Sequence, residues 1–188
     1  ASKVLTPPRT WEDFIAAAQK MVKGAPPRFT QLGFGIQPDG QDYHMVREVL
    51  VRQFGGTPFT DGGRKVAYNG DAGLKAMTFY TELFTKYKLG TPNFFPGNNS
   101  YRDAFIAGKV GMIIDGSFAV ATIKNGAKFN WGVMPLPTFK GSSVRSNFGS
   151  YWVNGITKNA KGDKLAASVK FLKFLTNEET MNTWLRSV

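Results

Sequence analysis

Short strand-like runs alternate with helical segments along this chain, and this alternation constrains the fold more than any other feature. Residues 105–118 show the pattern in one stretch: a helix end, a glycine turn, an apolar run over 110–114, then Asp115-Gly116-Ser117-Phe118. A second strand is expected at 32–37, after a helix that starts at Trp11 with Thr10 as its cap. Alternating strands and helices predict an α/β fold.

Spacing and turn residues place the other expected elements. The longest helix is expected over 69–90, where Leu74, Met77, Phe84 and Tyr87 recur near the helical period. The further helices are expected over 42–56, 101–108, 117–124, 163–176 and 177–188. Strands are expected at 129–137 and at 151–157, where apolar and polar residues alternate.

Composition excludes several classes of site. The 188 residues include no cysteine, which excludes disulfides, thiolate metal sites and cysteine nucleophiles. The net charge is +11, with Lys and Arg scattered through every segment, so either a solvated basic surface or an attraction to anionic partners is compatible with the sequence. No apolar run approaches the roughly 20 residues that a membrane helix needs.

The motifs of common enzymes are missing from the sequence. The 13 acidic residues are spread out, and a single histidine is available to activate a nucleophile. No G-x-S-x-G turn, phosphate-binding loop, H-E-x-x-H helix or EF-hand pattern is present. We therefore predict a protein that is not an enzyme, with no catalytic residues, no metal and no cofactor.

Seven segments occur in an order that is similar to that of a known family. They are "PPRTWEDFIAAAQKM", "FGG", "NGDAGLKAMTFYTELF", "FIAGKVGMIIDGSF", "WGVMPLPTFKG", "FGSYWVNGI" and "AASVKFLKFLTNEETMNTWL". Together they resemble the extracellular solute-binding proteins of bacterial ABC transporters, and especially the sugar-binding group that includes the maltose-binding protein. The resemblance runs from about residue 7 to residue 186.

The resemblance implies one lobe of a two-lobed periplasmic-binding-protein type II fold, with a mixed sheet flanked by helices. Residues 1–145 would form a ligand-binding lobe, and residues 146–188 would supply a hinge return strand and two helices that pack on a second lobe. Because the N-terminus has no signal-peptide pattern, we expect a fragment or a processed chain.

The resemblance also implies partners and a location. It implies capture of a sugar or oligosaccharide, possibly an acidic one, and its delivery to the membrane permease of an ABC importer. The location would be periplasmic or extracellular, tethered to the outer face of the cytoplasmic membrane. We further expect the fragment to self-associate through 146–188.

Candidate ligand residues cluster first around the end of the 110–114 strand. In the family, a G-x-W segment at this place stacks on the sugar; here the sequence has Gly116 and Phe118, which keeps an aromatic face but loses the indole N–H. Phe118 could equally pack inward at the first turn of its helix. Asp115 could bond sugar hydroxyls or cap that helix, and Gly116 could serve a turn or a close ligand approach.

Two other segments are expected to line the cleft. The loop 37–45 follows a strand, and the resemblance assigns its aromatic, Tyr43, to the cleft, with His44 beside it; a lone histidine is as readily a surface or helix-start residue. In "FGSYWVNG", Gly149 and Trp152 match a family segment on the hinge side of the cleft, with Tyr151 between them, although Trp152 could also be a core residue.

Two further possibilities remain open from the sequence. The loop 94–102 offers Asn98, Asn99 or Tyr101 to a ligand, or is an ordinary turn with a capping residue. As an alternative function, the basic charge and the aromatic content are compatible with a module that binds nucleic acid or another polyanion, although no nucleic-acid motif is present.

Overall fold

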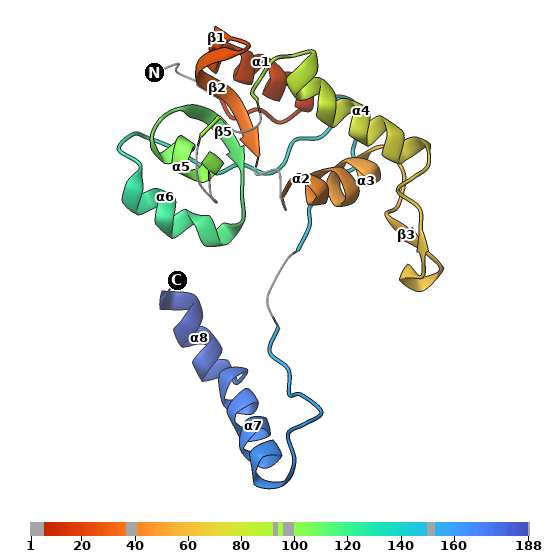
Figure 1. Ribbon diagram of the computed structural model, residues 1–188, viewed down its shortest axis with the longest axis vertical. Helices are drawn as coiled ribbons and strands as arrows, with labels where there is room; N and C mark the ends of the chain where they lie inside the picture. The colour runs from red at the N-terminus through yellow and green to blue at the C-terminus, as the bar shows by residue number, and fades with distance from the viewer. Residues whose placement is uncertain (1–5, 37–40, 92–93, 96–99, 150–152, 188) are drawn as a thin grey trace. The chain divides into compact units, whose positions relative to one another are not determined.

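The computed structural model describes residues 6–36, 41–91, 94–95, 100–149 and 153–187. The chain divides into two compact units, Ala1–Phe148 and Gly149–Val188, which are considered separately (Figure 1). In the first unit a mixed sheet is flanked by helices, which confirms the predicted fold class.

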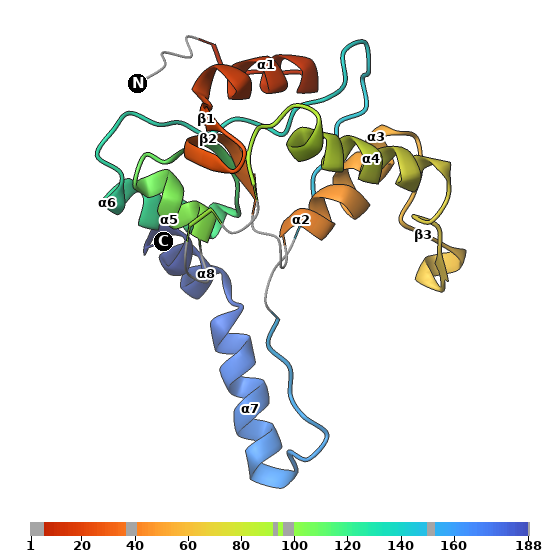
Figure 2. The same cartoon turned by 45° about the horizontal axis from the view of Figure 1, so that its top comes forward.

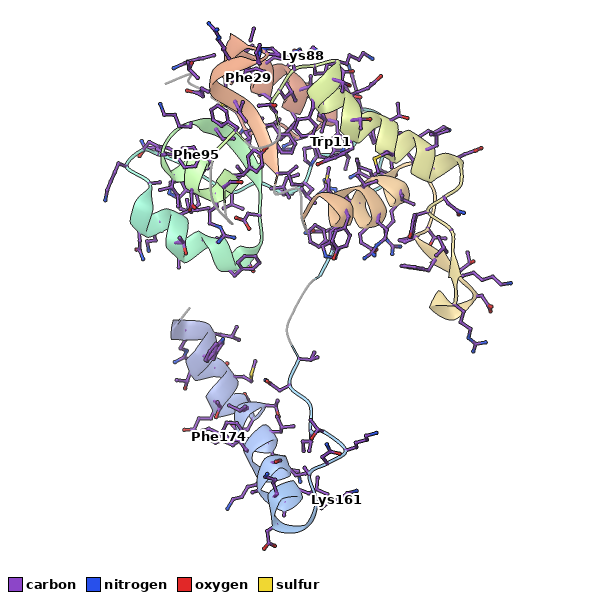
Figure 3. The ribbon with its side chains drawn as sticks, in the orientation of Figure 1. Trp11, Phe29, Lys88, Phe95, Lys161 and Phe174 are labelled. Atoms are coloured by element: carbon purple, nitrogen blue, oxygen red, sulfur yellow. The ribbon has the colours of Figure 1, made fainter. Side chains whose placement is uncertain are left out.

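The first unit opens with the predicted capped helix. Helix α1 spans Trp11–Met21, and the Thr10 hydroxyl accepts a hydrogen bond from the Asp13 N–H at 3.1 Å. Trp11 is fully buried among α1, α4 and the neighbouring loop, with ring contacts to Phe14 and Phe79 (Figure 3). This helix anchors the larger core of the unit.

The sheet has the order β1-β2-β5. Strands β1 (Lys23–Ala25) and β2 (Arg28–Ile36) form an antiparallel hairpin, and β2 begins four residues before the strand that was expected from residue 32. Strand β5 (Val110–Ile114) pairs with β2 in parallel, so that Ile36 lies opposite Ile114. Helix α1 packs closely on this sheet: a Cβ on Gly33 would lie 2.1 Å from the Ala18 carbonyl oxygen.

The predicted helix over 42–56 is a continuous helical segment with a wide turn inside it. It consists of α2 (Gln41–His44), the π-helix η1 (Met45–Leu50) and α3 (Val51–Gln53). The remaining short elements of this region are β3 (Phe59–Thr60), the 3₁₀ turn η2 (Asp61–Gly63) and β4 (Lys65–Val66), which form a hairpin.

Helix α4 (Asp71–Thr85) lies where a helix was expected, but two of the four apolar residues that indicated it do not face the core. Gly73, Ala76 and Leu83 are its buried residues, whereas Leu74 and Met77 are exposed. Close packing needs small side chains at the contact, and a Cβ on Gly73 would lie 1.6 Å from a backbone oxygen. Leu74 and Met77 therefore fall beside the contact face, whereas Phe84 and Tyr87 are partly buried against the core.

A predicted strand over 129–137 is absent from the described residues, and the reason is visible in the sequence. Pro135 and Pro137 have no N–H to donate to a ladder. The segment is tied down at single points instead: Gln53 accepts from the Trp11 indole at 2.7 Å and donates to the Pro137 carbonyl at 2.9 Å, and Thr138 forms an isolated bridge with Thr10.

The second unit contains the two predicted C-terminal helices, α7 (Gly162–Leu175) and α8 (Glu178–Ser187), in succession (Figure 2). Residues 153–157, the described part of another predicted strand, pair with no strand. Large apolar side chains on both helices are exposed, among them Phe171, Phe174 and Trp184. Within its described residues, the unit buries no side chain in a core.

Candidate functional site

The carboxyl ends of β2 and β5 lie side by side, because the parallel register pairs Ile36 with Ile114. Asp115 and Gly116 follow β5 directly, and the chain then turns into the 3₁₀ helix η3 (Ser117–Ala119) and α6 (Val120–Gly126). Helix α5 (Ser100–Ile106), which comes just before β5 in the sequence, packs against that strand (Figure 1). Loops that meet at the carboxyl ends of parallel strands are the usual place for a ligand.

Phe118 presents its ring to solvent at this edge of the sheet. Its side chain is 65% exposed, so the alternative that it packs inward at the helix start is wrong. The ring lies over Gly116, where an added Cβ would come within 2.1 Å of the ring atom Cε1. Gly116 has φ −80° and ψ 160°, which any residue adopts, so the glycine is needed for the space that the ring fills and not for a left-handed turn.

Asp115 is held by an arginine from α5. Arg102 donates from Nε to Oδ2 at 2.6 Å and from Nη2 to Oδ1 at 3.0 Å, and the Gly116 N–H donates to Oδ1 at 2.8 Å. The N-cap of η3 is Gly116, with no side-chain capping bond. The capping alternative for Asp115 is therefore wrong, and its carboxylate is engaged with Arg102 instead.

Arg102 also contacts the exposed ring. Its Cζ lies 5.3 Å from the Phe118 ring centroid, within the range of a cation–π contact. The Arg102 and Asp115 side chains are 17% and 14% exposed, so the ion pair is largely shielded from water. The hydrogen bonds to Asp115 raise the pKa of the Arg102 guanidinium above its ordinary value.

Together, Arg102, Asp115, Gly116 and Phe118 form what we call the strand-end cluster. It offers an apolar aromatic face beside a carboxylate and a guanidinium. This combination suits a sugar ring, which has an apolar C–H face and hydroxyls around its edge. The charges of the ion pair cancel, so the cluster has no net charge at neutral pH.

Tyr43 and His44 lie in a second group, the rim cluster, with Arg47 and Phe148. The His44 ring stacks on Phe148 at 4.8 Å and 12°, and lies 4.2 Å from the Tyr43 ring. Tyr43 is half exposed, and the Arg47 guanidinium lies 5.2 Å from its ring. The Nδ1 atom of His44 is buried, and the described residues offer it no hydrogen-bond partner, which is unusual for a polar atom.

The remaining predicted positions divide between described and undescribed residues. Gly149 is exposed and follows Phe148 of the rim cluster. Four of these positions lie outside the described residues: Tyr151, Trp152, Asn98 and Asn99. Tyr101 is buried and donates its hydroxyl to the Thr91 carbonyl at 2.7 Å, so it is a structural residue and not a ligand contact.

Arg102 is the member of the strand-end cluster that sequence reasoning missed. It lies in the helix that precedes β5, 13 positions before Asp115, and no short motif links the two. Because β5 runs back along α5, the residue after the end of the strand, Asp115, comes close to Arg102 near the start of the helix. An arginine on the face of such a helix is the signal that could have found it.

The sequence matches the family model described as "Bacterial extracellular solute-binding protein" over residues 2–182. The chain belongs to this family. The membership confirms the resemblance of the seven segments, and it covers both units of the structure. The family is one of extracellular proteins that bind solutes.

Solved structures of sugar-binding proteins share the fold. A maltose/maltodextrin-binding domain from Bdellovibrio bacteriovorus bound to maltotriose matches with a TM-score of 0.74 at 17% identity, covering 94% of this chain and 46% of that one. A Thermotoga lettingae solute-binding protein bound with α-D-tagatose gives 0.69 at 21%, covering 97% and 45%. The Thermus thermophilus maltotriose-binding protein bound with maltotriose gives 0.65 at 28%, covering 94% and 46%.

The chain thus spans about half the length of the solved structures that it matches. Across the ranges that the structure describes, no helix has both the length and the apolar character needed to span a membrane. Nor does any group of three or more histidine, aspartate or glutamate side chains there come together as a metal site would require.

Proposed function

We propose that this chain supplies one wall of a sugar-binding cleft in a solute-binding protein of an ABC importer. The observation that carries the proposal is Phe118: an exposed aromatic ring at the carboxyl end of a parallel strand pair, held over Gly116 beside a carboxylate and a guanidinium. Burying an aromatic ring in water-excluding contact with a sugar is favourable, whereas leaving it exposed has no structural benefit.

The family and the solved structures support this assignment. Proteins of the same fold were solved with maltotriose, tagatose and ribitol, all of which are neutral carbohydrates or polyols. The same proposal includes a partner permease in the membrane, a location outside the cytoplasm with a tether to the membrane, and the lack of an enzymatic activity. In it, the rim cluster contributes Tyr43 to the edge of the cleft.

Ligand-observed NMR is the test, because it detects millimolar affinities and one wall of a cleft binds weakly. The panel comprises maltotriose, tagatose, ribitol, glucuronate, glucose 6-phosphate and a single-stranded oligonucleotide, each at low and high salt. We expect saturation transfer to a neutral sugar that persists in salt and is weakened in Phe118→Ala. The matched control is Phe171→Ala, since Phe171 is 59% exposed and lies on α7.

Each other outcome has a definite meaning. Binding of glucuronate or the sugar phosphate alone, weakening with salt, would show that an acidic sugar is the ligand. Binding of the oligonucleotide alone, abolished by salt, would overturn the proposal in favour of a polyanion-binding module. Binding of a sugar that is equal in wild type and Phe118→Ala would place the site elsewhere.

A further inference from the structure

Arg102 joins α5 to the segment that follows β5 through two residues of the strand-end cluster, Asp115 and Phe118. It lies on a seven-residue helix, yet its guanidinium reaches out to Asp115 with two hydrogen bonds and covers the ring of Phe118. The two residues it touches are both candidate ligand contacts, and both come from the segment after β5. One side chain therefore links the aromatic face to the carboxylate.

We propose that Arg102 is a positioning residue of the sugar site, acting through Phe118 and Asp115. The inference rests on the proposed function. The ring of Phe118 is confined by the Gly116 backbone beneath it and by the Arg102 guanidinium 5.3 Å from its centroid. A ring that is held before the ligand arrives loses less rotamer freedom on binding, which strengthens the complex.

The hydrogen bonds of Asp115 give Arg102 a second effect on the site. An ionised carboxylate has about four acceptor positions, and here three are taken: Nη2 of Arg102 and the Gly116 N–H bind Oδ1, and Nε of Arg102 binds Oδ2. The remaining position on Oδ2 can accept one ligand hydroxyl. Arg102 thereby limits Asp115 to one acceptor position for a ligand, and it fixes the direction of that position.

The side chain has to be an arginine for both effects. Its planar fork matches the two oxygens of a carboxylate and can lie against an aromatic face, whereas the lysine ammonium is a compact point charge. Lysine at this position would keep the charge and most of the stem length. It would lose the paired hydrogen bonds that fix the orientation of Asp115.

The first test uses the wild-type chain alone, without a ligand and without any substitution. NMR of the wild-type chain should show NOEs between the Arg102 side chain and the Phe118 ring, slow exchange of the Arg102 Nε–H, and protection of the Gly116 amide. Each signal follows from a contact in the structure. An Arg102 Nε–H in fast exchange together with missing NOEs would overturn the inference.

The second test is a double-mutant cycle on affinity, using maltotriose. We expect Arg102→Met and Phe118→Ala each to weaken binding by about 2- to 10-fold. In Phe118→Ala, adding Arg102→Met should cost less than about twofold, because the residue acts through the missing ring. Arg102→Lys should recover only part of the affinity. Multiplicative losses in the double variant, or full recovery by lysine, would overturn the positioning role.

Controls separate this inference from the proposed function. Arg52→Met removes the same charge from an exposed ion pair with Glu48 and should leave affinity unchanged. Maltotriose bound by wild type but unaffected by Arg102→Met refutes the inference and leaves the proposed function intact. Failure of every sugar in the panel to bind counts against the proposed function, while the NMR contacts of wild type still decide whether Arg102 holds the ring.

Discussion

Gly116→Ala should weaken sugar binding while leaving the stability of the fold almost unchanged. The added Cβ would lie 2.1 Å from Cε1 of Phe118, 2.6 Å from Cδ1 and 2.8 Å from Cζ. Ordinary contact begins at 3.4 Å, so the ring has to retreat by about 1.3 Å from Cβ. Because the Phe118 ring is 65% exposed, it can move into solvent without disturbing the core.

The two effects differ in size because they depend on different neighbours. Alanine fits φ −80° and ψ 160°, and loss of a glycine stabilises by about 0.4–1 kcal/mol through the unfolded chain. The loss of a glycine N-cap offsets this by about 0.5 kcal/mol, so the unfolding free energy should change by less than about 0.5 kcal/mol. Misplacing an aromatic contact worth about 0.5–1.5 kcal/mol should weaken binding about 2- to 10-fold.

Urea unfolding and ligand-observed NMR titration with maltotriose measure the two quantities on one protein sample. Gly132→Ala is a matched control, since a Cβ there meets no atom within 4 Å. The reasoning would be refuted if Gly116→Ala bound maltotriose as wild type does. It would also be refuted by a loss of more than about 2 kcal/mol in unfolding free energy, which would mean that the ring belongs to the core.

Three further predictions concern the fold that carries the site. Gly33→Ala should destabilise by about 1–3 kcal/mol in urea unfolding, because its Cβ would lie 2.1 Å from the backbone oxygen of Ala18 and neither segment can retreat cheaply. Trp11→Phe should cost about 1–3 kcal/mol, since it leaves the buried Gln53 carbonyl oxygen without its 2.7 Å donor; a melting temperature equal to wild type would contradict this. Burial raises the pKa of Tyr101 above its ordinary value of 10.0, so its neutral form stabilises the fold below that pH and this contribution is lost as the pH rises beyond it. The stability advantage of wild type over Tyr101→Phe should therefore shrink between about pH 8 and about pH 11, and a constant difference would contradict it.

Local signals in the sequence were enough to predict much of the fold. The cap at Thr10 and the strand over 110–114 are as expected, because each depends on neighbours within a few positions. The exposure of Leu74 and Met77 was not predictable from apolar spacing, because the first half of α4 uses the small residues Gly73 and Ala76 at its contact. The strand expected at 129–137 failed because its two prolines outweigh its apolar pattern.

The candidate site shows the same division between local and distant information. The position of Phe118 after a buried strand was visible in the sequence, and its exposure in the structure agrees with a ligand-facing ring. The partner of Asp115 was not visible, because Arg102 comes from another element and is brought there by packing of α5 on β5. Ion pairs between elements leave no short-range pattern in the sequence, so the pair of Arg102 and Asp115 could be identified only from the folded structure.

The parallel register of β2 and β5 also bears on how the chain folds. Ile36 and Ile114 are separated by about half of the first unit, so the strand pair that carries the site closes a long loop. Helix α1 and the β1–β2 hairpin can form as soon as they leave the ribosome, but β2 keeps an unpaired edge rich in Leu32, Phe34 and Ile36 until β5 has been made. Truncations that end before residue 110 should therefore aggregate through that edge, while those that end after α6 should keep it paired.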